Sequence, residues 1–149
     1  MGRTLALLTA GFMLGWSSIA AAEVHVVEML NRGPDGENMV FSPAVTYAQP
    51  GDTVRFVSTD KGHNSETIDS AIPEGAEGWQ TRLNQDVEVT IDETGIYAFK
   101  CTPHFGVGMV GLIVSGDSTA NIEAVRAARY VGRADQRMTS LIDEVAQDS

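Results

Sequence analysis

Four side chains that suit metal binding fall in two short segments of the chain. Cys101, His104 and Met109 share residues 101–109, a segment shaped by one proline and two glycines, and His63 lies 38 residues before Cys101. Together they offer a thiolate, two imidazole rings and a thioether. If the fold brings the two segments together, these four groups form a single site.

The donor types favour copper over zinc at such a site. Two imidazoles and a thiolate with a weak axial thioether are the donors of blue copper centres, where sulfur suits Cu(I) and imidazole serves both oxidation states. Zinc also accepts one cysteine and two histidines, but a thioether adds little to a zinc site. Met109 is therefore the residue that favours copper.

Each of these residues alone has an ordinary structural role. A lone cysteine or methionine is usually packed in the core, and a lone histidine is usually a polar residue at the surface. The metal hypothesis depends on their joint spacing. A Cys/His nucleophile pair is the alternative chemistry, but the sequence offers no evident oxyanion-forming loop, which disfavours a hydrolase. His25 lies in an early strand-like segment without a nearby soft ligand and is interpreted as a non-ligand.

The elements that must position these residues follow a period of two from Val24 to Val114, which is typical of strands. Residues 87–91 alternate apolar and polar, residues 96–99 and 110–114 are apolar runs, and turn sequences separate such segments. The pattern predicts a mainly β fold, a β-sandwich or barrel. Loops from different strands meet at one end of a sandwich, which would bring His63 to residues 101–109.

After Gly116 the apolar period changes to that of helices. Ser118 and Thr119 are candidate N-caps for a short helix over residues 122–129. A second helix is predicted over residues 133–146, with apolar residues at i, i+3, i+4 and i+7, namely Met138, Leu141, Ile142 and Val145. These helices have no core of their own, so we expect both to pack against the sandwich.

The first 22 residues are predicted to be a secretory signal peptide. A short positive start ending at Arg3 precedes an apolar stretch, and Ala20 and Ala22 occupy the small-residue positions of a cleavage site. Cleavage after Ala22 would leave residues 23–149 as a single domain, with the β part over 23–116 and the helices over about 118–146. In an exported protein most cysteines pair, so an unpaired Cys101 is either inert in the core or kept for chemistry.

The charge of the chain excludes some classes of partner. Ten Lys and Arg against 20 Asp and Glu give a formal net charge of −10, which argues against binding nucleic acid or an anionic membrane. Residues 23–116 hold 14 acidic and 5 basic residues, a net charge of −9. The acidity therefore belongs mainly to the β part.

The two ligand segments, residues 61–64 and 101–111, resemble the pseudoazurin family, type 1 copper proteins of the cupredoxin superfamily. The resemblance covers nearly all of residues 23–149, including residues 29–31, 39–41, 50–54, 72–77 and the two C-terminal helices. It implies a cupredoxin Greek-key β-sandwich with two helices packed on it. It also implies one type 1 copper per chain, with His63, Cys101, His104 and Met109 as its ligands.

The resemblance assigns roles to residues around the copper. The backbone N–H of Asn64 would bond to the Cys101 sulfur, and Met39 would lie near the His104 ring, although plain core packing of Met39 stays open. Pro103 removes a backbone donor near the sulfur and stiffens the loop. Gly106 and Gly108 are expected to permit the turn that returns Met109 to the site.

The function implied by the resemblance is that of a diffusible, monomeric one-electron carrier in the periplasm, with no substrate chemistry. Electrons would pass through the exposed edge of His104 to copper nitrite reductase or c-type cytochromes of denitrifying bacteria. The plausible residues of the surrounding apolar patch are Phe105, Gly106, Val107, Pro43 and Pro103. A periplasmic copper-binding or delivery protein is the alternative function, and an electron-donating subunit bound to an enzyme is a third.

Family members also carry a ring of lysines around this patch, and this chain departs from that pattern. Its only two lysines are Lys61 and Lys100, each beside a predicted ligand. Arg32 and Arg82 are further candidates for the same face. A local basic group on an acidic body orients an encounter with an acidic partner, but two lysines beside a loop are also ordinary solvated charge.

Overall fold

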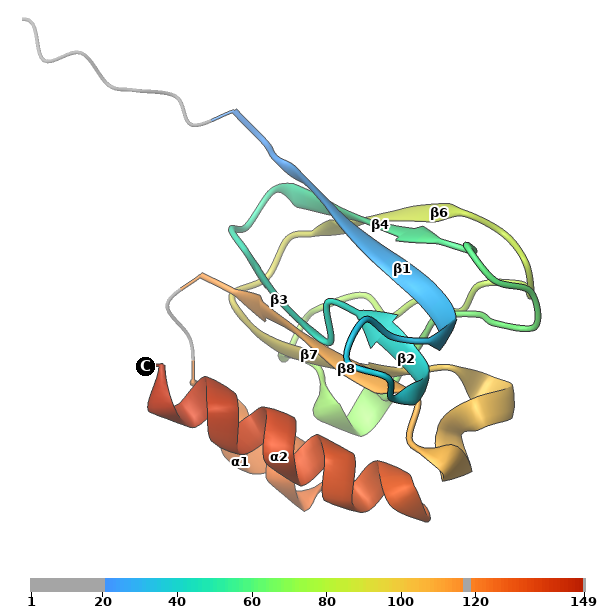
Figure 1. Cartoon of the computed structure of the whole chain (residues 1–149). Helices are drawn as coiled ribbons and strands as arrows, with labels where there is room; N and C mark the ends of the chain where they lie inside the picture. The colour runs from blue at the N-terminus through green and yellow to red at the C-terminus, as the bar shows by residue number, and fades with distance from the viewer. Residues whose placement is uncertain (1–20, 117–118, 149) are drawn as a thin grey trace, which may run out of the picture.

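The computed structural model describes residues 21–116 and 119–148, in which two four-stranded sheets pack face to face (Figure 1). The first sheet has the strand order β2-β1-β4-β6, built from β1 (Val24–Arg32), β2 (Asn38–Ser42), β4 (Asp52–Val57) and β6 (Val87–Ile91). The second has the order β3-β8-β7-β5, built from β3 (Val45–Ala48), β5 (Glu66–Thr67), β7 (Gly95–Lys100) and β8 (Val110–Ser115). The predicted β-sandwich is confirmed.

Both sheets are mixed in strand direction. β1 runs parallel to β4 and β3 runs parallel to β8, whereas the other pairs are antiparallel. Parallel neighbours need long crossover connections rather than tight hairpins. The alternation of apolar residues predicts strands but carries no information on such pairings, which the sequence therefore left open.

The two sheets differ in how many of their faces are covered. In β6, Ile91 is buried while Glu88 and Thr90 are exposed, as expected for a sheet with one solvated face. In β7, every residue before Lys100 is buried. Ile96 and Ala98 face the helices, and Tyr97 and Phe99 face the other sheet. This double coverage explains why residues 96–99 form a continuous apolar run.

Three phenylalanines form the centre of the sandwich. Phe99 meets Phe41 and Phe56 edge to face, with ring centroids 4.8 and 5.1 Å apart. Edge-to-face pairs contribute about 0.5–1.5 kcal/mol beyond the area they bury. Phe99 lies two residues before Cys101, so this cluster anchors the end of β7 from which the cysteine emerges.

The C-terminal segment forms α1 (Ile122–Ala127) and α2 (Arg133–Gln147), which cover the outer face of the second sheet. Met138, Ile142 and Val145 of α2 are buried as predicted, and Leu141 is half-buried. The helices together bury a second cluster against β7 and β8. The predicted packing of both helices on the sandwich is therefore confirmed.

The predicted start of α1 at residue 122 is confirmed, whereas its predicted end at residue 129 was wrong and Thr119 is not its N-cap. The helix follows Asn121, which makes no side-chain cap because its amide bonds to the N–H and carbonyl of Ile96 at 2.8 Å each. Ser118 lies outside the described residues. The helix ends at Ala127, before Arg129, since Ala128 is extended. The Tyr130 hydroxyl donates to the Val125 carbonyl and so satisfies one of the free carbonyls at the helix end.

The predicted signal peptide lies almost wholly outside the described residues, which begin at residue 21. Neither α1 nor α2, nor any other helix in the described part of the chain, has the length and apolar character needed to span a bilayer. A one-turn helix, η1 (Asp69–Ala71), connects β5 to the loop before β6.

Candidate metal centre

Three of the four predicted ligand groups converge at one end of the sandwich. The Nδ1 atoms of His63 and His104 lie 3.1 Å apart, and the Cys101 Sγ lies 3.7 and 3.5 Å from them. A point equidistant from three atoms at these separations lies about 2 Å from each, which is a normal metal–nitrogen bond length. The donor triangle therefore has the size of a metal site.

The tautomer of His63 leaves a lone pair free for this triangle. His63 is fully buried in the loop after β4, and its Nε2 lies 2.9 Å from Asn31 Oδ1. Because an amide oxygen only accepts, Nε2 carries the proton and donates it, and Nδ1 presents its lone pair to His104 and Cys101. Such outer bonds are typical of metal-ligating histidines.

Asn31, at the end of β1, is a site residue that reasoning from the sequence missed. It was noticed only as part of the resemblance and was given no role, since the sequence carries no sign that β1 ends beside residue 63. Asn84 was missed in the same way. Its side-chain oxygen accepts the Gly62 N–H at 2.6 Å and its own N–H donates to the His63 carbonyl, so it fixes the loop that holds His63.

The segment between Cys101 and Met109 closes on itself through its backbone. The Cys101 N–H donates to the Met109 carbonyl at 2.9 Å, and the N–H groups of His104 and Met109 donate to the carbonyls of Cys101 and His104. In between, η2 (Thr102–Val107) replaces the open loop that was expected, with Pro103 in its first turn. Ligands at positions 101, 104 and 109 are thereby held by main-chain bonds rather than by side-chain packing alone.

Only one of the two glycines predicted to shape this turn does so. Gly108 ends η2 with φ of 98°, a left-handed conformation that favours glycine. Gly106 does not adopt a positive φ, which corrects that part of the prediction. Its backbone instead lies against Gly132, where an added Cβ would overlap the Gly106 carbonyl oxygen.

Asn64 ties the two ligand segments together. Its side-chain oxygen accepts the Thr102 N–H at 2.8 Å, and its amide nitrogen donates to the Thr102 hydroxyl at 3.0 Å. Burial raises the pKa of the Cys101 thiol, and hydrogen bonds from the backbone N–H groups of Asn64 and His104 partly offset that rise. The hydrogen bond from the Asn64 N–H to the sulfur that the resemblance implies would act in this direction, and it stays a prediction.

The electrostatic setting of His63 favours a neutral imidazole. Burial, followed by the nearby His104, lowers its pKa below the usual 6.5, with Asp60 acting in the opposite direction. A neutral ring keeps the lone pair that a metal needs, and a thiol loses its proton when a metal binds. His63 is therefore already neutral and able to bind a metal, whereas the Cys101 thiol must lose its proton when the metal binds.

Both methionines of the predicted site lie at this end of the core. Met109 is fully buried in the same cluster as Cys101, and Met39 is partly buried and packs against that cluster. Met39 has φ of 53°, unusual for a residue with a side chain. The predicted contact of Met39 with the His104 ring stays a prediction.

The basic residues predicted to dock a partner differ in their exposure and in whether an acidic side chain pairs with them. Lys61 and Arg32 are exposed near the His63 loop and at the end of β1. Lys100 pairs with Glu66 at 3.6 Å and lies 5.2 Å from the centre of the Phe105 ring. Its charge is therefore partly neutralised. The Thr102 hydroxyl and Lys100 also lower the pKa of Glu66, which keeps that carboxylate ionised beside the site.

The apolar surface around the ligand loop has members that the sequence did not predict. Val107 is 46% exposed, as expected for the patch, and Phe105 is half-buried. Leu83 is 50% exposed in the segment fixed to His63 by Asn84, and Val131 is 38% exposed beside Gly132, which contacts Gly106. Exposed apolar side chains alone are too common to be a signal in sequence.

His25 lies away from the triangle, as predicted. Its Nε2 is 3.0 Å from Asp52 Oδ2 at the start of β4, the opposite end of β1 from Asn31. With a thiolate, two imidazoles and a thioether gathered in a dry site, the donor set fits copper better than zinc.

Comparison with known proteins agrees with this assignment. Residues 27–115 match the family model described as copper binding proteins of the plastocyanin/azurin family. A pseudoazurin of Paracoccus pantotrophus is 43% identical over 136 residues, covering 91% of this chain and 93% of that protein. One from Methylorubrum extorquens AM1 is 40% identical over 141 residues, covering 95% of both. A Sinorhizobium pseudoazurin structure, 45% identical, superposes with a TM-score of 0.82 and covers 85% of this chain and 99% of that one.

Proposed function

Because this chain belongs to the plastocyanin/azurin family of copper-binding proteins, as a pseudoazurin-like type 1 copper electron carrier, we propose that His63, Cys101, His104 and Met109 are its copper ligands. We also propose that it carries single electrons between partner proteins in the periplasm. The observation that supports the ligand set best is the triangle of Nδ1, Nδ1 and Sγ atoms with separations of 3.1–3.7 Å. Met109 completes the set from the same closed backbone loop.

Copper supplies the reversible gain and loss of one electron when it is bound. The chain supplies a site that changes little during that step, since the ligand loop is held by its own main-chain bonds and by Asn64. A thiolate suits Cu(I) and imidazoles serve both states. A donor set held between the arrangements that Cu(I) and Cu(II) prefer needs little rearrangement when the electron moves, and this favours rapid electron transfer.

The route for the electron is through His104. The other histidine ligand is fully buried, whereas His104 is partly exposed within the apolar surface of Phe105, Val107 and Leu83. A partner that covers this surface excludes water and brings its own redox centre close to the ring edge.

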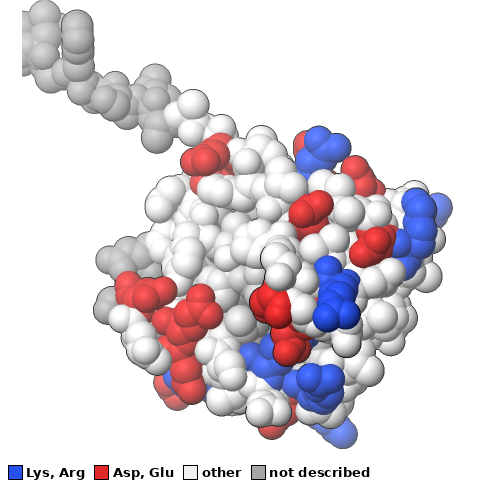
Figure 2. Space-filling model, viewed as in Figure 1, with Lys and Arg blue, Asp and Glu red and all other residues white. Residues whose placement is uncertain are grey.

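Charge supports docking of an acidic partner surface at the same end. On the face shown in Figure 2, most Lys and Arg side chains lie in the right half, where Figure 1 places η2 and the start of α2. Several Asp and Glu lie among them, and the charged side chains of the left half are mostly Asp and Glu. Such a dipole orients an encounter even though the chain as a whole is acidic. The family resemblance suggests copper nitrite reductase or c-type cytochromes as partners, and the signal peptide suggests the periplasm.

The colour of the loaded protein tests the proposed ligand set. Cu(II) bound to the Cys101 thiolate is expected to give intense visible absorption that bleaches on one-electron reduction and returns on oxidation. A copper-delivery protein would instead bind Cu(I) in an open, exchangeable site. A colourless Cu(II) complex would refute the proposed electron-transfer site.

Salt dependence of the electron-transfer rate tests the docking face. Lys61→Glu is expected to slow transfer to an acidic partner and flatten its salt dependence, more than Lys100→Glu, whose charge Glu66 already offsets. The double variant Gln49→Glu/Gln147→Glu changes net charge equally at exposed positions of the opposite end and serves as the control. Equal effects of Lys61→Glu and the control would show that net charge, not the docking face, matters.

A further inference from the structure

Arg137, in the second turn of α2, points toward the ligand loop rather than into solvent. Its side chain is only 19% exposed. Its Nη1 donates to the Gly108 carbonyl at 2.7 Å and to the Met39 carbonyl at 3.1 Å, and its Nη2 donates to Glu37 Oε2 at 2.6 Å. One guanidinium thus joins segments that are 29 and 98 residues away from it in the chain.

Both residues whose carbonyls Arg137 binds have a left-handed backbone. Gly108 has φ of 98° and directly precedes Met109, and Met39 has φ of 53°. A non-glycine residue in this region is strained and persists only where its surroundings hold it. Charge-assisted hydrogen bonds, about twice as strong as neutral ones, are such a restraint.

The helix that carries Arg137 is itself fixed against the loop. Gly132, just before α2, approaches Gly106 so closely that a Cβ would overlap its carbonyl oxygen, and the backbone of Arg133 lies against Gly108. Met138 packs in one cluster with Val110, the residue after Met109. Glu37 neutralises the guanidinium and orients it. Arg137 therefore acts from a rigid element rather than from a loop.

We infer that Arg137 is a positioning residue that holds the Met109 side chain at the copper by fixing the Gly108 carbonyl just before it and the backbone of the neighbouring Met39. This rests on the proposed function, since only there is Met109 an axial ligand. The axial ligand tunes the potential of blue copper sites, so the C-terminal helix takes part in setting the properties of the metal. No ligand touches Arg137 directly, and its effect passes through the two carbonyls.

The test compares Arg137→Met, which keeps the length of the side chain and removes its donors, with Arg133→Met. Arg133 lies on the same helix and approaches the same Glu37, at 3.9 Å, but its side chain is 70% exposed. In the copper-loaded protein, Arg137→Met is expected to change the relative strengths of the visible absorption bands, shift the reduction potential and release copper to a chelator about tenfold faster. Arg133→Met is expected to leave all three unchanged, and Arg137→Lys to restore part of the loss.

Amide hydrogen exchange in the copper-free protein gives a readout that does not depend on the metal. The Met109 N–H, which bonds to the His104 carbonyl, is expected to exchange faster in Arg137→Met than in Arg133→Met. Unchanged exchange would overturn the inference. So would faster exchange together with an unaltered spectrum and potential in the loaded protein, because Arg137 would then stabilise the loop without positioning the ligand. Failure of the proposed function shows separately, as a wild-type protein without thiolate–copper absorption.

Discussion

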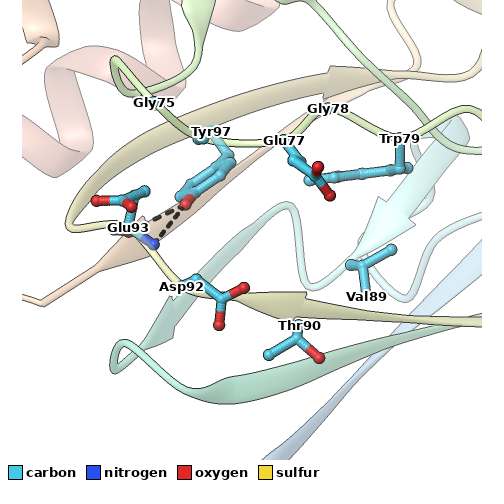
Figure 3. Close-up of a pocket in the computed structure, with 10 residues that line it drawn as sticks. Gly75, Glu77, Gly78, Trp79, Val89, Thr90, Asp92, Glu93 and Tyr97 are labelled. Atoms are coloured by element: carbon cyan, nitrogen blue, oxygen red, sulfur yellow. Dashed lines mark hydrogen bonds between the residues drawn. The ribbon is translucent and has the colours of Figure 1, made fainter.

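The two ends of the sandwich differ in what they hold: one carries the converging donor atoms, and the other carries a cleft. At one end, three donor atoms lie within 3.7 Å of one another in a closely packed, largely buried cluster. At the other end, a cleft of about 390 Å³ lies beside β6 and the start of β7. Figure 3 shows Glu77, Trp79, Asp92 and Tyr97 around it. Tyr97 is four residues before Cys101, about 13 Å along the strand.

The difference between the ends lies in which polar groups are already satisfied. In the cleft, the Tyr97 hydroxyl donates to the Glu93 carbonyl and accepts the Glu93 N–H, both at 3.0 Å, so it serves the turn before β7. At the metal end, Asn31 accepts the hydrogen bond from the His63 Nε2–H, which leaves the Nδ1 lone pair facing the His104 and Cys101 donor atoms. Converging lone pairs, rather than hollow volume, mark the functional end of this molecule.

Of the substitutions that test the difference between the two ends, removal of the Cys101 thiolate should have the largest effect. Cys101→Ser is expected to abolish the intense visible absorption and to weaken copper binding about 100-fold or more, since it replaces a ligand rather than a residue that supports one. Titration with Cu(II) followed by absorption and by chelator competition measures both effects. The matched substitution in the cleft is Tyr97→Phe, which should cost about 1 kcal/mol of stability and leave the copper spectrum unchanged. Equal changes of the copper spectrum in Cys101→Ser and Tyr97→Phe would show that the two ends of the sandwich do not differ in function.

Removing the partner of His63 should have an intermediate effect. Asn31→Leu deprives the Nε2–H of its acceptor, so the ring loses its fixed tautomer, and copper affinity is expected to fall about 10–100-fold. Asn31→Asp keeps an accepting oxygen at the same place and is expected to retain most of the affinity. Chelator competition at one pH measures all three proteins. Equal losses in the two variants would show that Asn31 acts by packing rather than as an acceptor.

The smallest effect concerns the far end and appears only in acid. Hydrogen bonds from the Glu23 N–H, His25 and the Gln49 N–H hold the pKa of Asp52 at about 2, below its usual 3.8. A lowered pKa in the folded state stabilises the fold above the unfolded value, and this contribution is lost as the pH falls from about 4 to about 2. Asp52→Asn should therefore be less stable than wild type at neutral pH, with the gap closing across that window.

Urea unfolding of the two loaded proteins at several pH values measures this gap. The ligands are the same in both, so their own protonation cancels in the difference. A gap that stays constant from neutral pH to pH 2 would show that Asp52 acts through its shape and not through its charge. The copper spectrum at neutral pH should be the same in both proteins, because Asp52 lies at the end of β1 opposite Asn31.

The sequence predicted those parts of the fold that depend on local pattern. The period of two gave the strands, the spacing of Met138, Ile142 and Val145 gave α2, and the joint spacing of one cysteine, two histidines and one methionine gave the metal site. The parallel pairings, Asn31, Asn84 and Arg137 were not predicted. Each of these acts across tens of residues through a few hydrogen bonds or through strand register. An asparagine or arginine in the sequence does not reveal which distant group it will meet.

Local signals also failed where a distant contact took over a residue. Ser118 and Thr119 were the candidate N-caps of α1, yet the N-cap position is Asn121, whose amide bonds to β7 instead of to its own helix. Lys100 beside Cys101 was expected on the docking face, but Glu66 and Phe105 hold its ammonium group. In both cases the side chain bonds to a residue that is distant in sequence, so its role differs from the one that its neighbours in sequence suggested.

The parallel pairing of β3 with β8 affects the order in which the chain folds. Val45 pairs with Leu112, 67 positions later, so the second sheet closes a long loop before its contacts stabilise it. Chains dominated by such non-local pairings fold in about milliseconds to seconds. β7 and β8 flank the residues at 101, 104 and 109, whereas His63 lies in the loop that crosses from β4 of the first sheet to β5 of the second. We therefore expect all ligands to meet only late in folding, so that copper enters a nearly finished protein instead of directing its first collapse.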